Sequence, residues 1–265
     1  INRRLAQRAG PIIPFIAETG GQNVMIADSS ALPEQLVDDV IRSAFNSAGQ
    51  RCSALRVLFV QEEAADRVLE MLSGAIAELR IGDPMCVDTD IGPLIDAQAL
   101  SALNAHAAHM ASAGRLIAQT PLPPDLAQGY YFAPRAYEID SLAHLTAEVF
   151  GPILHVIRYR ADHLDTICAA INALGYGLTL GIHSRIEARV QAVCARIRVG
   201  NIYVNRNMIG AVVGAQPFGG EGLSGTGPKA GGPRYLHRFA TERTRSTDTT
   251  ASGGNATLLA LRDDE

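Results

Sequence analysis

The chain has 265 residues, of which 47% are hydrophobic, and a formal net charge of −4. This hydrophobic content suffices for the core of one large or two modest globular domains. The slightly negative net charge does not indicate a nucleic-acid partner. No apolar run approaches the roughly 20 residues that span a bilayer, and four cysteines without a CxxC spacing do not make a disulfide framework. We therefore expect a reduced, cytoplasmic protein with no membrane segment and no metal site.

The first residues, INRRLAQRAGP, indicate the last turns of a helix that Gly10 and Pro11 close. Because the beginning of that helix is absent, we expect the chain to be a fragment of a longer protein. Two short apolar runs follow, IIPFIAET at 12–19 and NVMIA at 23–27, separated by a Gly-Gly pair. They predict two buried strands.

Strand and helix patterns then alternate as far as residue 205. Apolar residues at helical spacing predict helices over 33–47, 62–79, 97–114, 164–174 and 186–197. Short apolar runs predict strands over 55–60, 115–119, 130–139, 152–159, 178–184 and 201–205. This alternation predicts an α/β fold with a largely parallel sheet.

Composition changes sharply after residue 210. Residues 210–232 are too rich in glycine for a core element and predict a long ordered loop whose backbone closely approaches another group. The run RTRSTDTT at 243–250 alternates in polarity and predicts an edge or intersubunit strand. An exposed edge pairs with a partner or is covered, so we expect a homo-oligomer.

Cys52 lies between the flexible loop SAGQR and the strand-like run LRVLFV. Such junctions are where reactive groups are presented to substrate, whereas an inert buried thiol is the default interpretation of Cys86, Cys168 and Cys194. Cys52 is therefore the candidate nucleophile. None of the seven histidines lies in a metal-ligand pattern such as HExxH, and no GxSxG motif is present.

Four stretches occur in order: ETGGQN, GQRCSA, EVFGP and QPFGGEGLSGTG. Together they resemble the aldehyde dehydrogenase superfamily across nearly the whole chain. AETGGQN, FNSAGQRCSALR and the run from NIYVN to KAGGP are most similar to L-glutamate γ-semialdehyde (1-pyrroline-5-carboxylate) dehydrogenases, including that domain of bifunctional bacterial proline-utilization proteins. The resemblance implies oxidation of L-glutamate γ-semialdehyde to L-glutamate with reduction of NAD⁺, in proline catabolism.

The resemblance also implies a division of the chain. Residues 1–30 would be the tail end of the dinucleotide-binding domain, 31–232 the catalytic domain, and 233–265 a C-terminal segment with the oligomerisation strand. The rest of the nucleotide fold, with an Asn that donates to the oxyanion, is expected upstream of Ile1. We therefore expect the isolated chain to bind NAD⁺ poorly, and a proline dehydrogenase domain is one expected fusion partner.

Two residues are implied to be catalytic. A Cys52 thiolate would add to the aldehyde, forming a thiohemiacetal that collapses to a thioester. A free thiol has a pKa of about 8.5, so nearby donors or a cation should favour the thiolate, and backbone N–H groups would hold the oxyanion. Glu18 would activate the water that hydrolyses the thioester, its pKa raised by partial desolvation at the end of an apolar strand.

The remaining implied roles concern cofactor and substrate. Glu148 would accept hydrogen bonds from the nicotinamide-ribose hydroxyls. Phe150, Thr19, Gly20 and Gly21 would lie beside the same end of the cofactor. Gly210 and Ala211 would bind the substrate carboxylate as a backbone nest, aided by the Ser53 hydroxyl. Phe45 and Phe218 would enclose the substrate's methylene chain.

Three alternatives stay open. The substrate could be another aldehyde, which a non-matching anchor loop would have indicated. A thiol hydrolase or esterase could use Cys52 and Glu18 without a cofactor, although no clear histidine partner for Cys52 is visible. The chain could also be a non-catalytic assembly fragment whose tail strand pairs with a second subunit.

Overall fold

The computed structural model describes residues 1–248 and 257. The strands are β1 (Val24–Ala27), β2 (Val57–Gln61), β3 (Arg115–Gln119), β4 (Arg135–Glu138), β5 (Ile153–Tyr159), β6 (Tyr176–Gly177), β7 (Thr179–His183), β8 (Asn201–Val204) and β9 (Glu221–Gly222). The helices are α1 (Asn2–Ala6), α2 (Pro33–Phe45), α3 (Glu62–Ala77), α4 (Ala97–Ala113), α5 (Leu164–Ala173) and α6 (Glu187–Arg196). The elements predicted between residues 23 and 205 are all present, mostly with shorter bounds.

Seven strands form one sheet in the order β3-β4-β5-β2-β1-β7-β8. All neighbours in this sheet are parallel except β3 and β4. Strands β1 and β2 are buried along their whole length, which explains why both are continuous apolar runs in the sequence. The predicted α/β fold with a largely parallel sheet is confirmed.

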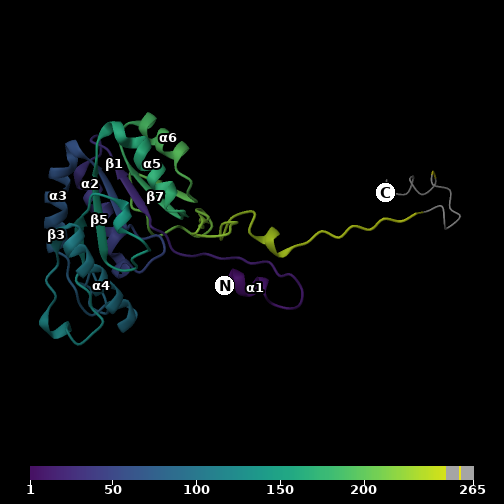
Figure 1. Cartoon of the computed structure of the whole chain (residues 1–265), viewed down its shortest axis with the longest axis horizontal. Helices are drawn as coiled ribbons and strands as arrows, with labels where there is room; N and C mark the ends of the chain where they lie inside the picture. Colours follow the sequence, from purple (N-terminus) through teal and green to yellow (C-terminus); the bar gives the residue numbers. More distant parts are fainter. Residues whose placement is uncertain (249–256, 258–265) are drawn as a thin grey trace.

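Helices cover both faces of the sheet (Figure 1). The chain moves from β1 to β2 through α2 in one direction, and from β5 past β2 and β1 to β7 through α5 in the opposite direction. Because such crossovers are almost always right-handed, opposite directions put their helices on opposite faces. Helices α2 and α3 accordingly pack together on one face, and α5 and α6 on the other.

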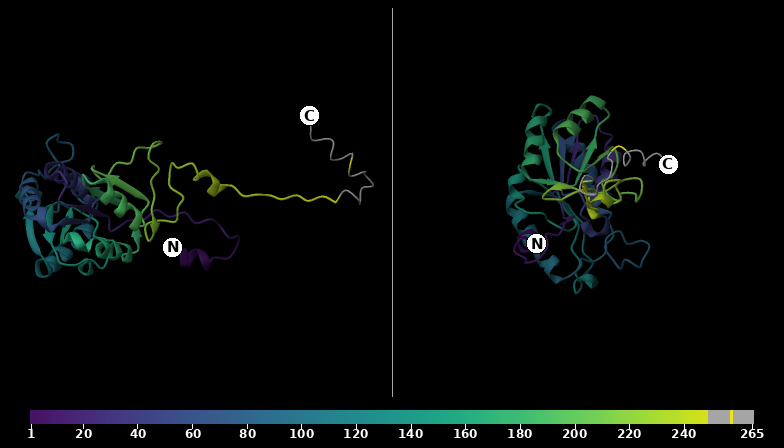
Figure 2. Two further views of the ribbon diagram at one scale, coloured as in Figure 1. Left: turned by 90° about the horizontal axis from the view of Figure 1, so that it is seen from above. Right: turned by 90° about the vertical axis from the view of Figure 1, so that its right-hand side faces the viewer.

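The two ends of the described chain extend away from the sheet and its helices (Figure 2). Helix α1 ends at Ala6, before the predicted stop at Gly10. The strand predicted over 12–19 is wrong: apart from a single bridge between Glu18 and Gly225, these residues pair with no strand. Prolines 11 and 14 lack the N–H that a ladder needs, and Ile12 is fully exposed rather than buried.

Residues 243–250 were predicted to form an edge or intersubunit strand. The described residues 241–248 are exposed and lie in no strand of this chain, so pairing with a second subunit stays a prediction. Thr249 and Thr250 lie outside the described residues. None of the helices within the described part of the chain combines the length and apolarity needed to cross a membrane.

The residues on either side of position 30 pack against one another. Strand β1 lies in the middle of the sheet, where Val24 pairs with Val57 on one side and Leu180 on the other. Residues 22–30 therefore belong to the same structural unit as the residues that follow.

Candidate active site

The loop that carries Cys52 is held at the amino ends of three parallel strands. Asn23, directly before β1, donates from Nδ2 to the carbonyls of Cys52 (2.7 Å) and Ala54 (2.9 Å). Thr179, the first residue of β7, donates from Oγ1 to the carbonyl of Ser53 (3.3 Å). Cys52 itself precedes β2 by a few residues. The backbone on both sides of the thiol is thus fixed to the sheet.

The approach to Cys52 uses an uncommon backbone conformation. Ser47, Ala48 and Gly49 have φ values of 57°, 52° and 63°, a region that costs a non-glycine residue about 1–2 kcal/mol. A side chain on Gly49 would collide with the carbonyl of Gly151. Such strain persists only where surrounding contacts hold it in place, and it is concentrated at functional sites.

A buried cation supplies those contacts. The guanidinium of Arg56 donates to the carbonyls of Gly49 (2.7 Å), Gly151 (3.2 Å) and Arg51 (3.1 Å), and lies 3.5 Å from Glu148 Oε1. Burial lowers the pKa of Arg56 to about 10, although the charge of Glu148 acts in the opposite direction. Arg56 therefore stays charged at neutral pH and joins the nucleophile loop to the EVFGP stretch.

Glu148 is half-buried beside this cation. Its Oε1 is buried and accepts no hydrogen bond from the described residues. A side chain on Gly20 would collide with the Glu148 carboxylate, so glycine is needed there to admit it. Phe150 is 44% exposed, with its ring centroid 5.0 Å from the Arg56 guanidinium carbon. The EVFGP stretch thus presents one carboxylate and one open aromatic face.

Glu18 lies against the glycine-rich loop. It accepts a hydrogen bond from the backbone N–H of Gly220, and a Cβ on Gly219 would lie 2.8 Å from its Oε1. Desolvation raises the pKa of Glu18, and the Gly220 bond partly offsets that rise. The predicted rise in pKa is confirmed, although Glu18 lies in an isolated bridge to Gly225 rather than at a strand end.

The residues after Glu18 differ in exposure. Thr19 is exposed, and its backbone N–H donates to the carbonyl of Ser224 (3.1 Å). Gly21 is buried, and a Cβ there would lie 2.5 Å from Asn23 Oδ1. Gly20 and Gly21 therefore make room for neighbouring side chains of this chain.

The electrostatics of Cys52 differ from the expectation. Desolvation is the largest cause that raises the pKa of its thiol. The backbone N–H groups of Ser53 and of Cys52 itself lower that pKa, and the charges of Glu148 and Glu18 raise it further. Among the described residues the expected thiolate-favouring environment is not found: the nearby cation, Arg56, is paired with Glu148.

The predicted substrate residues divide into two groups. Gly210 is exposed with φ +73°, and the N–H groups of Gly210 and Ala211 donate to no acceptor among the described residues. Phe218 is half-buried and pairs through its backbone with Ala230. Ser53 is buried beside the thiol. These positions are compatible with a carboxylate near the loop.

Phe45 is placed differently. It is 0% exposed within the hydrophobic core, at the end of α2. Because this side of α2 packs onto the sheet, its ring has no free surface for a substrate. The predicted contact between Phe45 and the substrate chain is therefore corrected to core packing.

Two further residues that shape the site were missed from the sequence. Asn23 stands directly before an apolar strand, and Arg56 lies within the apolar run ALRVLFV. A charge in such a run must be paired when it is buried, so Arg56 carried a usable signal. The sequence signal for Asn23 was weaker, because its hydrogen bonds depend on which loop the fold places beside it.

The comparisons with known proteins show the family of the chain. A model of the aldehyde dehydrogenase family matches residues 1–244. The chain belongs to that family. The bifunctional protein PutA of Escherichia coli (strain K12) is 54% identical over 254 residues, which cover 93% of this chain and 19% of that protein. The chain thus spans about a fifth of the length of this relative.

Solved structures of family members superimpose on the chain. A crystal structure of bifunctional proline utilization A has a TM-score of 0.89 at 60% identity, covering 96% of this chain and 25% of that one. The 1-pyrroline-5-carboxylate dehydrogenase from Thermus with bound NAD has a TM-score of 0.75 at 32% identity, covering 84% of this chain and 43% of that one. Among the described residues, no group of three or more His, Cys, Asp or Glu is arranged to hold a metal ion.

Proposed function

We propose that this chain is the catalytic portion of an NAD⁺-dependent dehydrogenase that oxidises L-glutamate γ-semialdehyde to L-glutamate in proline catabolism. The observation that carries the proposal is the meeting of three motif segments at one end of the sheet: Arg56 joins the carbonyl of Arg51, beside Cys52, to the Glu148 carboxylate, and that carboxylate lies against Gly20, two residues after Glu18. The similarity to PutA and to 1-pyrroline-5-carboxylate dehydrogenase supports the choice of substrate.

Cys52 acts as the nucleophile. Its thiol gives up its proton to solvent water, and the thiolate forms a bond to the aldehyde carbon as the C=O π electrons move to oxygen, giving a thiohemiacetal whose oxyanion the backbone N–H groups near Cys52 can stabilise. Bound NAD⁺ supplies the two-electron acceptor that converts this adduct to a thioester. Glu18 then takes a proton from water, whose oxygen adds to the thioester carbon and releases the Cys52 thiol and the carboxylic acid.

The chain's residues fit the nicotinamide-ribose end of that cofactor. Glu148 has a buried oxygen without a hydrogen-bond donor, and a carboxylate suits a ribose diol, which has two O–H donors. Phe150 offers its exposed face beside it. We assign Glu148 to the ribose hydroxyls, and Phe150, Thr19, Gly20 and Gly21 to the surroundings of the same end.

For the substrate, we assign its α-carboxylate to the free N–H groups of Gly210 and Ala211 and to the Ser53 hydroxyl. Phe218 would pack on the methylene chain, leaving the aldehyde directed at Cys52. The assignment is supported by the left-handed conformation at Gly210 and by the absence of an internal acceptor for either amide among the described residues.

The setting of the chain is part of the proposal. The share of PutA that the chain covers supports a longer bifunctional protein with a proline dehydrogenase domain. We also propose a cytoplasmic homo-oligomer, for which the open edge of β8 offers a strand to pair. Residues 31–232 would carry the catalytic domain and 233–265 the contact between subunits.

NADH formation with L-glutamate γ-semialdehyde tests the function. Three proteins are compared: this chain, the chain preceded by a complete nucleotide-binding fold, and that longer form with Cys52→Ala. We expect NADH only from the longer form with Cys52 intact. A longer form carrying Cys86→Ala is the matched control, because Cys86 is also exposed, and it should keep full activity. A silent longer form with Cys52 intact would refute the proposal.

A further inference from the structure

One buried serine contacts both halves of the candidate site. Ser43 lies in the last turn of α2 and is fully buried. Its backbone carbonyl accepts a hydrogen bond from Leu55 N (2.9 Å), three residues after Cys52. Its hydroxyl accepts one from Met208 N (3.0 Å), two residues before Gly210. A single residue thus links the backbone of the nucleophile loop to the backbone of the loop proposed to bind the carboxylate.

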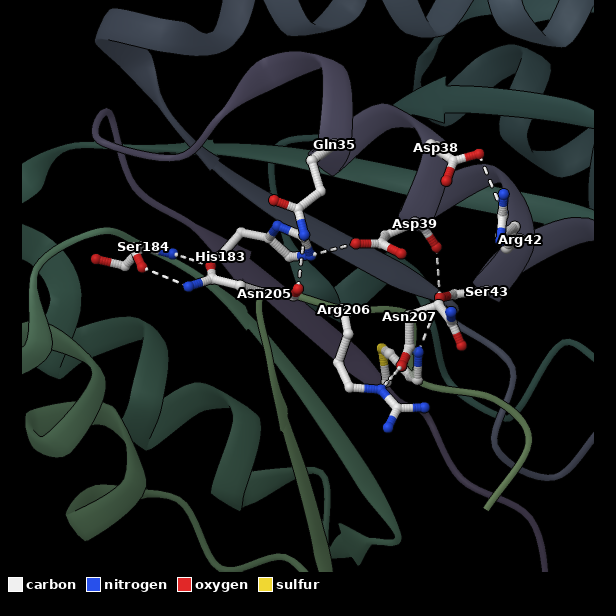
Figure 3. A network of polar contacts seen from close by, with 11 residues as sticks. Gln35, Asp38, Asp39, Arg42, Ser43, His183, Ser184, Asn205, Arg206 and Asn207 are labelled. Atoms are coloured by element: carbon white, nitrogen blue, oxygen red, sulfur yellow. Dashed lines mark hydrogen bonds and ion pairs between the residues drawn. The ribbon is translucent and has the colours of Figure 1, made fainter. Parts of the chain in front are cut away.

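The hydroxyl of Ser43 is itself oriented by the helix. Oγ donates to the carbonyl of Asp39 one turn earlier (2.5 Å), so its lone pairs face Met208 N. Figure 3 shows Ser43 and Asp39 side by side on α2, facing the chain segment that contains Asn207. The polar groups of Asn207 lower the pKa of the nearby Asp39 carboxyl and so oppose the larger rise that burial causes. Helix α2 therefore binds Met208 directly and lies beside Asn207.

The segment is fixed at its beginning as well. Asn205 has φ +51°, and its side chain bonds the backbone N–H (3.0 Å) and carbonyl (2.9 Å) of Ser184 (Figure 3). Its own carbonyl accepts from Gln35 Nε2 (2.7 Å). Met208 is buried at the position opposite Gly181, where a Cβ would come within 3.1 Å of its sulfur. Residues 205–208 are thus held before the chain emerges at Gly210.

We propose that Ser43 is a positioning residue that sets the separation between the Cys52 thiol and the Gly210–Ala211 amides, and thereby selects aldehydes whose carboxylate lies one glutamate-length chain away. This inference rests on the proposed function. The separation is fixed through rigid backbone contacts on both sides, so a change at Ser43 alters recognition of the carboxylate without altering the reacting groups.

The test compares two substrates in the form of the enzyme that has a complete nucleotide-binding fold. L-Glutamate γ-semialdehyde carries the carboxylate, and pentanal has the same chain length without it. Ser43→Ala leaves Met208 N without its acceptor. It should lower kcat/KM for the semialdehyde about tenfold, the equivalent of one lost hydrogen bond. The loss should appear in KM, while kcat/KM for pentanal changes less than about twofold.

A second readout needs no cofactor. L-Glutamate should protect Cys52 from iodoacetamide, and Ser43→Ala should raise the concentration for half-protection about tenfold. The alkylation rate without L-glutamate should stay unchanged. Thr120→Val is the matched control, because Thr120 is also buried and its hydroxyl also bonds a backbone carbonyl, that of Ile76 (2.8 Å). It should leave the substrate ratio and the protection unchanged.

The outcomes separate the two proposals. A wild-type enzyme that does not oxidise the semialdehyde refutes the proposed function, and this inference with it. A wild-type enzyme that oxidises it, with a Ser43→Ala variant whose substrate ratio is unchanged or equal to that of Thr120→Val, refutes the role of Ser43 alone. If Ser43→Ala does not fold, Asn207→Ala loosens the same segment from a half-buried position and must reduce the same ratio.

Discussion

The two ends of the parallel sheet use their polar groups differently. At the carboxyl ends of β1 and β7, the side chains satisfy one another: Asp28 accepts hydrogen bonds from Ser30 and from the Ser184 hydroxyl. At the amino ends, the side chains of Asn23 and Arg56 donate hydrogen bonds to backbone carbonyls. The latter arrangement leaves the Cys52 thiol exposed beside the half-buried carboxylate of Glu148.

The contrast is informative because open α/β sheets usually bind ligands at the carboxyl ends, where the strand order reverses. Here that point lies between β1 and β7, where Asp28, Ser30 and Ser184 hydrogen-bond one another. The candidate site lies at the opposite end, where the loop of Cys52 is held through its backbone carbonyls while the Cys52 side chain is exposed.

The largest expected effect is on stability and comes from replacing Arg56, the buried cation at the amino end of the sheet. Arg56→Met removes the donor for three carbonyls and leaves the Glu148 charge unpaired. We expect the free energy of unfolding in urea to fall by about 3–5 kcal/mol, as for other broken buried pairs. Arg67→Met is the control, because its ion pair with Glu34 is exposed, and it should change less than about 1 kcal/mol. Equal losses in the two variants would contradict the role of Arg56.

A histidine pair at the same end should make stability depend on pH. His155 Nδ1 lies 3.0 Å from the Arg56 carbonyl and its Nε2 lies 2.8 Å from His106 Nε2. Burial lowers the pKa of His155 to about 3 and that of His106 to about 4. Both values lie below the unfolded pKa of about 6.5. As the pH falls below that value, the unfolded chain takes up protons that the folded chain does not.

Stability should therefore be full above pH 6.5 and decline toward pH 4, by about 1.4 kcal/mol per pH unit for each such histidine. Urea unfolding between pH 7 and 4.5 measures the slope. His155→Gln should make the decline shallower by about that amount, whereas His163→Gln, an exposed position, should keep the wild-type slope. A wild-type slope in His155→Gln would contradict a neutral buried His155.

The smallest expected effect is on the pH dependence of Cys52 alkylation. Because partial desolvation of the exposed thiol and the charges of Glu148 and Glu18 raise the pKa of Cys52, its alkylation by iodoacetamide should become fast only at alkaline pH. Glu148→Gln removes one of those charges and should shift the profile to lower pH. Glu62→Gln, on α3, should not shift it. Mass spectrometry of the Cys52 peptide measures the rate, and an unshifted Glu148→Gln profile would show that the charge does not reach the thiol.

The fold was largely predictable because its main strands and helices have clear apolar patterns. β1 and β2 are continuous apolar runs, and α2 begins at a proline suited to its first turn. The strand predicted over 12–19 had a suitable local pattern, but these residues form only one isolated bridge. Strand formation needs a neighbour, and a single sequence segment does not specify one.

Cys52, Glu18 and Glu148 stand in sequence motifs, so the sequence alone was enough to nominate them as site residues. Phe45 was misplaced because a phenylalanine beside a motif resembles a ligand contact even when its helix face turns inward. Asn23, Arg56 and Ser43 act through backbone groups of segments far away in the chain. Contacts of that kind depend on tertiary structure, so no local sequence pattern predicts them.

The most direct test of the central claim is the detection of a covalent intermediate on Cys52. The Glu18→Gln variant, in the form with a complete nucleotide-binding fold, is mixed with NAD⁺ and L-glutamate γ-semialdehyde, quenched in acid and analysed by peptide mass spectrometry. We expect a glutamyl thioester on the Cys52 peptide, because the variant cannot activate the hydrolytic water. NADH formed without any adduct on Cys52, or an adduct on another residue, would contradict the account.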